Sequence, residues 1–225
     1  MRFYRQGLFP EAEQAATHVI DTEGGRPGAA EGYYIRACAR SQVGRQDEAR
    51  DDYERAVLLS KRNDLTARAR AALGTLAADS GRYQGACEHF EKAVDQLPSR
   101  PPLDEILYRY GLSLQRVGRW REGRRVLGQI LLKFRGRPVE EAARRLFSWP
   151  DDFFAIQFGA FRRRSNAESL AGELRQAGWD ASVRTEIRSG HGAYLVRGGR
   201  YETYAEARQA LDRARVIEPE AFVVP

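Results

Sequence analysis

The residues that most often perform acid–base or metal chemistry are few in this chain of 225 residues, and they lie far apart in the sequence. The histidines are His18, His89 and His191, and the first two fall in helical patterns. The sequence contains no HExxH, GxSxG, P-loop or CxxC motif. His191 stands between two glycines, where a role in a hairpin turn is favoured over catalysis. We therefore expect no enzymatic activity, no metal site and no cofactor.

Adjacent carboxylates are the other candidates for acid–base chemistry, and they form two pairs. Asp51 and Asp52 fall on the surface of a helical pattern, whereas Asp151 and Asp152 precede a strand. Both positions are typical of solvated charge or of capping, so we interpret neither pair as catalytic.

Two strands in the last third of the chain carry side chains that can hydrogen-bond a polyhydroxylated ligand, although exposed strand residues without any ligand would show the same pattern. Residues 153–161 alternate apolar with small or polar side chains, the period of a half-buried strand, and 193–201 form a second strand. Each strand continues through glycine and an aromatic residue into a polar turn and a helix. Residues 151–225 therefore predict the order βαββαβ, an α/β sandwich with a four-stranded antiparallel sheet.

Alternation assigns the side chains of this sheet to two faces. Aromatic and branched residues such as Phe154 and Val196 are predicted to face the two helices. The other face is predicted to be open, with groups that hydrogen-bond sugar hydroxyls or stack on sugar rings. The predicted ligand-binding residues of that face are Gln157, Ser182, Arg184, Leu195 and Arg197, and Phe222 and Val224 are expected to edge it.

Two segments of this region resemble the SPOR (sporulation-related repeat) family. They read Phe-Ala-Ile-Gln-Phe-Gly-Ala-Phe at 154–161 and Tyr-Leu-Val-Arg-Gly-Gly-Arg-Tyr at 194–201. The resemblance extends from residue 152 to about 224, and it implies a domain that binds bacterial peptidoglycan, favouring glycan strands stripped of their stem peptides. The chain departs from the family at Gly198, where a branched apolar residue is usual, so we expect a looser strand end.

The same βαββαβ order also occurs in sheets that bind RNA. Those sheets need aromatic residues on their two central strands for base stacking. Here the aromatic residues of the first strand are predicted to point inward, and residues 151–225 hold 11 basic and 11 acidic residues. RNA binding is therefore kept only as a third hypothesis.

In the first 150 residues, four glycines mark a constant period. Gly7, Gly44, Gly81 and Gly118 follow one another at intervals of 37 residues, with small and apolar residues recurring after each. Small residues at such positions let paired helices approach closely. The pattern resembles the tetratricopeptide repeat (TPR), a helix–turn–helix unit of about 34 residues, and predicts an all-α helical-hairpin solenoid.

The repeat pattern also predicts where the helices and domains lie. The predicted helices are 10–21, 30–43, 47–60, 65–79, 82–96, 103–117 and 120–134, with 138–147 as a capping helix. Only six residues precede Gly7, so we expect the first repeat to lack its first helix, and we infer that the natural protein extends further or that this end packs on something else. The predicted domains are 1–148, with about three and a half repeats and the capping helix, and 149–225.

A groove lined by the first helix of each repeat is the expected partner-binding surface of such an array. Its arginines favour an acidic peptide or a C-terminal carboxylate. The alternative is that these arginines only keep the array soluble. The predicted partner-binding residues are Tyr33, Arg36, Arg40, Arg70, Arg109 and Arg116.

Composition restricts the remaining possibilities. The formal net charge of +6 lies in residues 1–150, and Cys38 and Cys87 are too few for a disulfide framework, so we expect buried thiols. No apolar run reaches the roughly 18 residues of a membrane span. The first residues lack the apolar segment of a secretory signal, so a protein acting outside the cytoplasm is expected to be a mature form or a fragment.

Taken together, these patterns predict a non-enzymatic bacterial cell-envelope or periplasmic protein. The resemblance implies that the C-terminal domain binds peptidoglycan, at division sites or during wall remodelling, while the repeats recruit a protein. The alternative is an assembly scaffold whose SPOR-like domain does not bind glycan.

Overall fold

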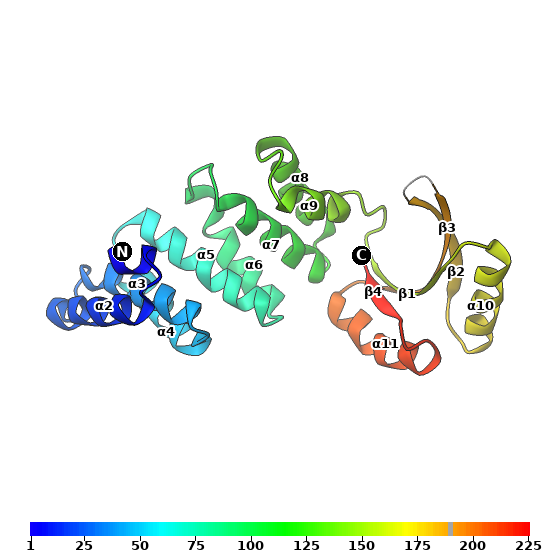
Figure 1. Cartoon of the computed structure of the whole chain (residues 1–225), viewed down its shortest axis with the longest axis horizontal. Coiled ribbons are helices and arrows are strands. Elements are labelled where there is room, and N and C mark those ends of the chain that lie inside the picture. The colour runs from blue at the N-terminus through cyan, green and yellow to red at the C-terminus, as the bar shows by residue number, and fades with distance from the viewer. Residues whose placement is uncertain (189–190) are drawn as a thin grey trace. The chain divides into compact units, whose positions relative to one another are not determined.

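The computed structural model describes residues 1–188 and 191–225 (Figure 1). The chain divides into two compact units, Met1–Ser113 with Val126–Ala143, and Leu114–Arg125 with Arg144–Pro225. The predicted boundary between residues 148 and 149 stays a prediction. The predicted turn around Gly190 lies outside the described residues, although the backbone of the strand that begins at His191 is described.

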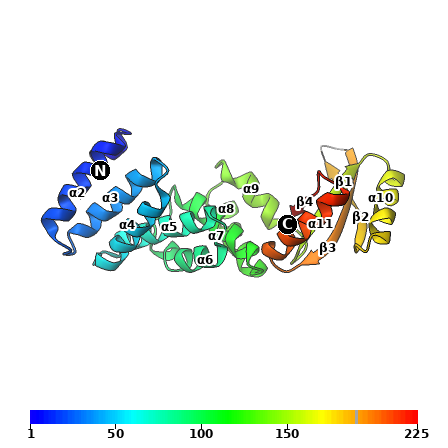
Figure 2. The same ribbon diagram turned by 90° about the horizontal axis from the view of Figure 1, so that it is seen from below.

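The described part of the first 150 residues is helical, as the repeat pattern predicts. Its elements are α1 (Arg2–Arg5), α2 (Phe9–Glu23), α3 (Ala29–Gln42), α4 (Gln46–Leu59), α5 (Asn63–Asp79), α6 (Tyr83–Glu91), the 3-10 helix η1 (Val94–Gln96), α7 (Leu103–Arg116), α8 (Trp120–Lys133) and α9 (Val139–Phe147). Within this region α2 packs against α3, α3 against α4, α4 against α5 and α5 against α6 (Figure 2). The fold class predicted for this region is therefore confirmed.

Two details of the helical region differ from the prediction. A short helix, α1, forms before Gly7 and packs against both α2 and α3, so the first repeat has a partial first helix. The helix predicted over 82–96 ends at Glu91 and continues as η1, because the chain changes from α-helical to 3-10 hydrogen bonding near Ala93.

The four periodic glycines have a common structural role. Gly7, Gly44, Gly81 and Gly118 have φ angles of 76°, 82°, 73° and 82°, the left-handed conformation that glycine adopts without a steric penalty. A small residue is also needed at Gly74, where a Cβ would lie 2.8 Å from the ring of Phe90. The repeat period thus arises from the turns that join paired helices and from the close crossings between them.

Residues 154–224 form the predicted βαββαβ order, which is confirmed. The elements are β1 (Phe154–Phe161), α10 (Arg164–Gln176), β2 (Ala181–Arg188), β3 (His191–Tyr201), α11 (Tyr204–Ile217) and β4 (Phe222–Val224). The sheet is antiparallel with the order β2-β3-β1-β4. A capping box begins α11, in which Thr203 accepts from the backbone N–H of Glu206 while the Glu206 side chain accepts from that of Thr203.

The hydrophobic core of this sheet lies on the side covered by α10 and α11. Ile156, Phe158 and Val196 pack there against Leu174 of α10 and Leu211 of α11, as alternation predicts. Residues on the same strands at the intervening positions point to the opposite side, so Gln157 and Arg197, which are register partners, belong to the other face.

A bulge in β1 ends the alternation earlier than the sequence suggests. The register shifts between Gln157 and Gly159. A Cβ at Gly159 would meet the ring of Phe161 and lie 3.5 Å from Leu170 of α10. Gly159 therefore faces the helices, whereas simple alternation places it on the opposite face.

Candidate functional site

The sheet face opposite the helices bears two adjacent hollows. The larger is a cleft of about 660 Å³, and the smaller has a volume of about 120 Å³. Of the five predicted ligand-binding residues, Gln157 and Leu195 line only the cleft, Ser182 lines only the smaller hollow, and Arg184 and Arg197 line both. All of these residues belong to the second compact unit, so the structure brings the predicted set together on one surface.

The centre of this face is covered, although the sequence predicts an open face. Leu195 is fully buried, Gln157 is 4% exposed, and the side chain of Arg197 is 11% exposed. Arg197 donates from Nε to Oε1 of Gln157 over 3.4 Å, and its Nη2 lies 3.5 Å from Oε2 of Glu186. Gln157 therefore acts as a support for the Arg197 guanidinium.

The segment Trp149–Phe153, called the strap below, contributes to both hollows. The Arg197 guanidinium carbon lies 4.8 Å from the centre of the Trp149 ring, a cation–π distance. Trp149 Nε1 donates to the backbone oxygen of Phe153 over 3.2 Å, and Arg184 Nη1 donates to Oδ2 of Asp151 over 2.7 Å. These strap contacts were not foreseen from the sequence, because all three depend on how the chain enters β1.

An exposed aromatic ring lies at the edge of the cleft. Phe222 of β4 is 48% exposed and is the register partner of Gln157. Val224, two residues on, is 8% exposed and lines the same cleft. The sequence places both residues at the edge of this face, and an exposed ring there can stack on the apolar side of a sugar.

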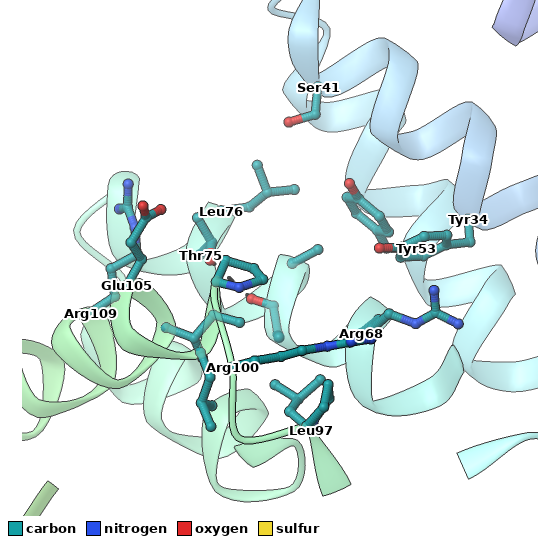
Figure 3. Close-up of a pocket in the computed structure, with 16 residues that line it drawn as sticks. Tyr34, Ser41, Tyr53, Arg68, Thr75, Leu76, Leu97, Arg100, Glu105 and Arg109 are labelled. Atoms are coloured by element: carbon teal, nitrogen blue, oxygen red, sulfur yellow. Dashed lines mark hydrogen bonds between the residues drawn. The ribbon is translucent and has the colours of Figure 1, made fainter. Parts of the chain in front are cut away.

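A second cavity, of about 450 Å³, lies in the first unit (Figure 3). Its floor is formed by small and apolar side chains of α5 and α7, among them Ala71, Thr75 and Ile106. Leu97 and Pro98, after η1, form one wall. The lining of this cavity thus combines small and apolar side chains with a few polar and charged ones, as is typical of ligand pockets.

The rim of this cavity carries positive charge. Arg68, Arg100 and Arg109 line it together with a single carboxylate, Glu105. Arg68 donates to Asp64 over 2.7 Å, and its guanidinium carbon lies 5.5 Å from the ring centre of Tyr34.

Of the predicted partner-binding residues, only Arg109 lines this cavity, and it forms an ion pair with Asp79. Tyr34 and Arg68 were missed, although both lie on first helices of repeats, as the predicted residues do.

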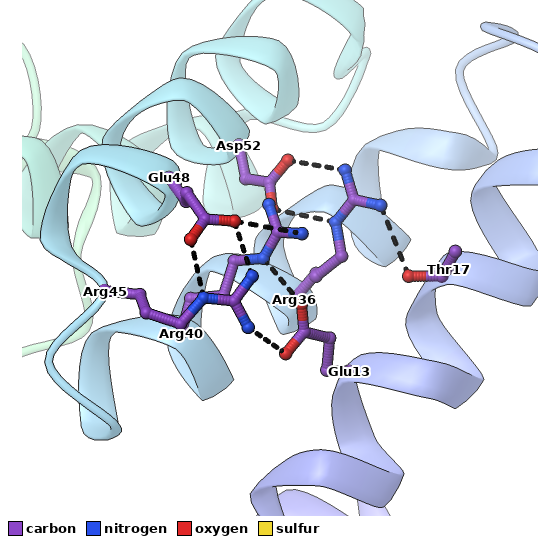
Figure 4. Close-up of polar contacts among 7 residues, drawn as sticks. All are labelled: Glu13, Thr17, Arg36, Arg40, Arg45, Glu48 and Asp52. Carbon is purple, nitrogen blue, oxygen red and sulfur yellow. Dashed lines mark hydrogen bonds and ion pairs between the residues drawn. The ribbon is translucent and has the colours of Figure 1, made fainter.

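Two other predicted partner-binding residues, Arg36 and Arg40, hold helices of the array together (Figure 4). Arg36 donates to both carboxylate oxygens of Asp52 over 2.8 Å and to Thr17 over 3.2 Å. Arg40 donates to Asp52 over 2.9 Å and to Glu13 over 2.8 Å. The interpretation of Asp52 as solvated charge is wrong, because only 5% of its side chain is exposed.

The remaining predicted residues occupy different surroundings. The ring of Tyr33 lies 5.4 Å from the Arg36 guanidinium carbon, and Arg70 is half-buried on α5. Arg116 lies in the second unit, where its guanidinium carbon is 3.3 Å from the centre of the Tyr204 ring. Arg36, Arg40 and Arg116 therefore have contacts within the chain that compete with a role in partner binding.

Neither cysteine forms a disulfide. Cys87 is buried, and Cys38 is half-buried next to Tyr53, whose hydroxyl lies 3.4 Å from its sulfur. Burial raises the pKa of the Cys38 thiol, which favours the unreactive protonated form. Within residues 1–188 and 191–225, no cluster of His, Cys, Asp and Glu has the arrangement of a metal site.

Comparison with known families agrees with both resemblances. The family model described as "SPOR domain" matches residues 150–225, and the model described as "Tetratricopeptide repeat" matches residues 36–101. The two matches occur in the predicted order. No curated protein matches the chain.

Solved structures show the same repeat fold. The chain is similar to a structure described as "Podosopora anserina putative kinesin light chain nearly identical TPR-like repeats", with 18% identity and a TM-score of 0.50 over 78% of this chain and 86% of that chain. A variant of that protein gives 15% identity and a TM-score of 0.50 over 97% of this chain and 91% of the other. At these identities the likeness shows the fold alone.

Proposed function

We propose that this chain, in which tetratricopeptide repeats precede a SPOR domain, is a non-enzymatic protein of the bacterial cell envelope. Its SPOR sheet binds glycan strands of peptidoglycan that lack stem peptides, and its repeats recruit a protein during cell division or wall remodelling. The single observation that carries the proposal is the cleft of about 660 Å³ on the sheet face of the SPOR domain, with arginines and an exposed aromatic ring on its lining.

The side chains of the cleft suit a sugar polymer. Arg184 and Arg197 offer guanidinium donors for hydroxyl, acetamido and carboxylate oxygens, and Phe222 offers an exposed ring. Gln157 holds the Arg197 guanidinium in place instead of contacting the ligand, since it is almost completely buried. The cleft is also within the size range of ordinary ligand sites.

The partner of the repeats is proposed to be an acidic peptide with an apolar anchor residue. The cavity in the first unit combines an apolar floor with three arginines and one glutamate on its lining. An apolar side chain would occupy the floor while flanking carboxylates contact Arg68, Arg100 and Arg109. The recruited protein would then be held at the glycan.

A periplasmic location is part of this proposal, because glycan strands are exposed there. None of the described helices has the length and apolar character needed to cross a membrane.

The proposal is tested by sedimentation of the full chain with purified peptidoglycan sacculi, with and without amidase treatment to remove stem peptides. The wild-type chain is expected to sediment, and more of it after amidase treatment. Arg184→Ala and Arg197→Ala are each expected to weaken binding at least about tenfold, since each removes charge-assisted hydrogen bonds to the ligand.

Arg208→Ala is the matched control, because Arg208 is an exposed arginine of α11, on the helical side of the SPOR domain. It is expected to sediment like the wild type. Absence of sedimentation by the wild-type chain would instead support the scaffold hypothesis, provided that the repeats still capture a partner.

A further inference from the structure

Both arginines proposed to bind glycan are already occupied by the strap. The indole of Trp149 lies against the Arg197 guanidinium at 4.8 Å, and the Asp151 carboxylate accepts from Arg184 over 2.7 Å. The strap thus presents a flat ring to one arginine and a carboxylate to the other. Trp149 precedes the first residue matched by the SPOR family model, and Asp151 is its second residue.

A muramic acid residue without its stem peptide offers the same two features, a pyranose ring and a free lactyl carboxylate. Amidase cleavage hydrolyses the amide bond between this carboxyl group and the peptide, which leaves the carboxylate behind. In a strand that still bears peptides, the same group is an uncharged amide. A guanidinium that pairs with carboxylates therefore distinguishes the two forms of the strand.

We propose that Arg184 is the residue that selects stripped glycan, through its lactyl carboxylate, and that the strap fills the positions of ring and carboxylate until the glycan displaces it. This inference rests on the proposed function of the sheet face. It names the chemical group recognised, the residue that recognises it, and the segment of the chain that competes for the site.

Displacement of the strap would also join the two hollows of the sheet face. Trp149, Arg184 and Arg197 line both the cleft and the smaller hollow, so they stand where the two meet. Once Trp149 leaves this position, the smaller hollow, which includes Ser182, and the cleft, which includes Phe222, would form one continuous surface. A polymer needs such a continuous surface, whereas a single sugar does not.

The strap contacts are weak enough to be exchanged. The Arg184 side chain is 40% exposed and that of Asp151 is 19% exposed, so water screens their ion pair. The cation–π contact of Arg197 is made with Trp149, which is only half-buried, so we expect it to contribute a similarly small amount. A competitor of this strength lowers the apparent affinity for glycan about threefold to tenfold without blocking it.

The test is sedimentation of full-length Asp151→Asn and Trp149→Ala with amidase-treated sacculi, compared with the wild type. Each substitution removes one strap contact and is expected to tighten binding about threefold to tenfold. Asp152→Asn is the matched control, because the neighbouring Asp152 pairs with Arg124 and not with Arg184. It is expected to bind like the wild type.

A second set of sacculi, whose carboxylates have been converted to amides with carbodiimide and ammonia, tests the recognised group. On these amidated sacculi, Asp151→Asn is expected to bind no more tightly than the wild type. The Arg184→Ala chain is expected to bind the amidated and the unmodified sacculi equally. Tryptophan fluorescence supplies an independent readout, since displacement exposes Trp149 to water and shifts its emission to longer wavelength. Trp149→Phe removes that shift if it arises from the strap.

The two proposals fail in different ways. If wild type and strap variants all remain in the supernatant, the proposed glycan function itself is overturned. If the wild type sediments while Asp151→Asn and Trp149→Ala bind no more tightly, the strap does not compete and this inference is overturned. Equal binding of the free-carboxylate and amide sacculi by the wild type overturns the selectivity assigned to Arg184.

Discussion

Arg36 of α3 donates two hydrogen bonds, each of 2.8 Å, to the two carboxylate oxygens of Asp52 on α4. The pair is largely buried, with side-chain exposures of 16% and 5%. These hydrogen bonds raise the pKa of Arg36 above its ordinary value. Arg40 donates to the same carboxylate and also pairs with Glu13, so Asp52 bridges two arginines of α3 and is the charged partner of Arg36.

Asp52→Ala is therefore expected to lower the free energy of unfolding of the helical unit by about 3–5 kcal/mol, because it leaves buried positive charge without its partner. Urea unfolding followed by circular dichroism measures the change. Asp51→Ala is the control, since the Asp51 side chain is 74% exposed, and it is expected to change stability by less than about 0.5 kcal/mol. Equal destabilisation by both substitutions would contradict this role.

A second prediction concerns Gly198, where the SPOR family usually has a branched apolar residue. A Cβ at Gly198 would lie 3.1 Å from Cε2 of Phe158 and 3.4 Å from the backbone oxygen of Asp180. The ring of Phe158 thus occupies space that a branched side chain would need. Gly198→Val is expected to destabilise the chain by about 1–3 kcal/mol through overpacking.

The control for Gly198→Val is Gly172→Ala on α10, where an added Cβ meets no atom within 4 Å. Alanine is the better helix former, so this change is expected to stabilise by about 0.5–1 kcal/mol. Thermal unfolding of the full chain compares the two variants. A Gly198→Val chain as stable as the wild type would show that Phe158 can move aside.

How far the sequence predicts this molecule depends on the range of the interactions involved. The turn glycines and the alternation of β1 are local signals, because a positive φ or a half-buried strand leaves a pattern in adjacent residues. They predicted the order of helices and strands. The bulge after Gln157 broke the pattern, since register depends on the partner strand and not on the strand itself.

The functional residues were harder to predict, because contacts between segments distant in sequence decide whether a side chain is exposed to a ligand or partner. Arg36 was predicted to bind a partner, yet its guanidinium pairs with Asp52, sixteen residues on, within the chain. Gln157 was identified from its strand pattern, but its burial depends on the packing around it. Sequence spacing gave the face of each element without revealing what covers that face.

A third prediction follows from His89 on α6. Burial lowers the pKa of His89 below its ordinary value of 6.5. The carboxylates of Glu54 and Glu88 oppose this shift, while Lys92 and Arg70 add to it. As pH falls through 6.5 the unfolded chain takes up a proton that the folded chain resists, so this contribution to stability is present above that pH and is lost below it.

Urea unfolding of wild type and His89→Gln between pH 7.5 and pH 5 tests this sign. The wild type is expected to lose more of its free energy of unfolding on acidification than the variant does. Parallel pH profiles would show that His89 does not contribute to the acid sensitivity of the array.

The last prediction concerns the charged rim of the cavity in the repeats. If carboxylates of the partner contact Arg68 and Arg109, replacing both arginines by glutamate reverses the local charge and is expected to weaken partner binding by well over tenfold. The double variant is compared with the wild type in pull-down at several salt concentrations, since attraction between exposed charges falls as salt rises.

The control is Arg50→Glu with Arg55→Glu on α4, which gives the same change of net charge away from the cavity lining. Partner binding that the cavity variant retains, or that both double variants lose equally, would mean that the cavity is not the binding site. Loss confined to the cavity variant, with sedimentation on sacculi unchanged, would separate the site for the protein from the site for the glycan.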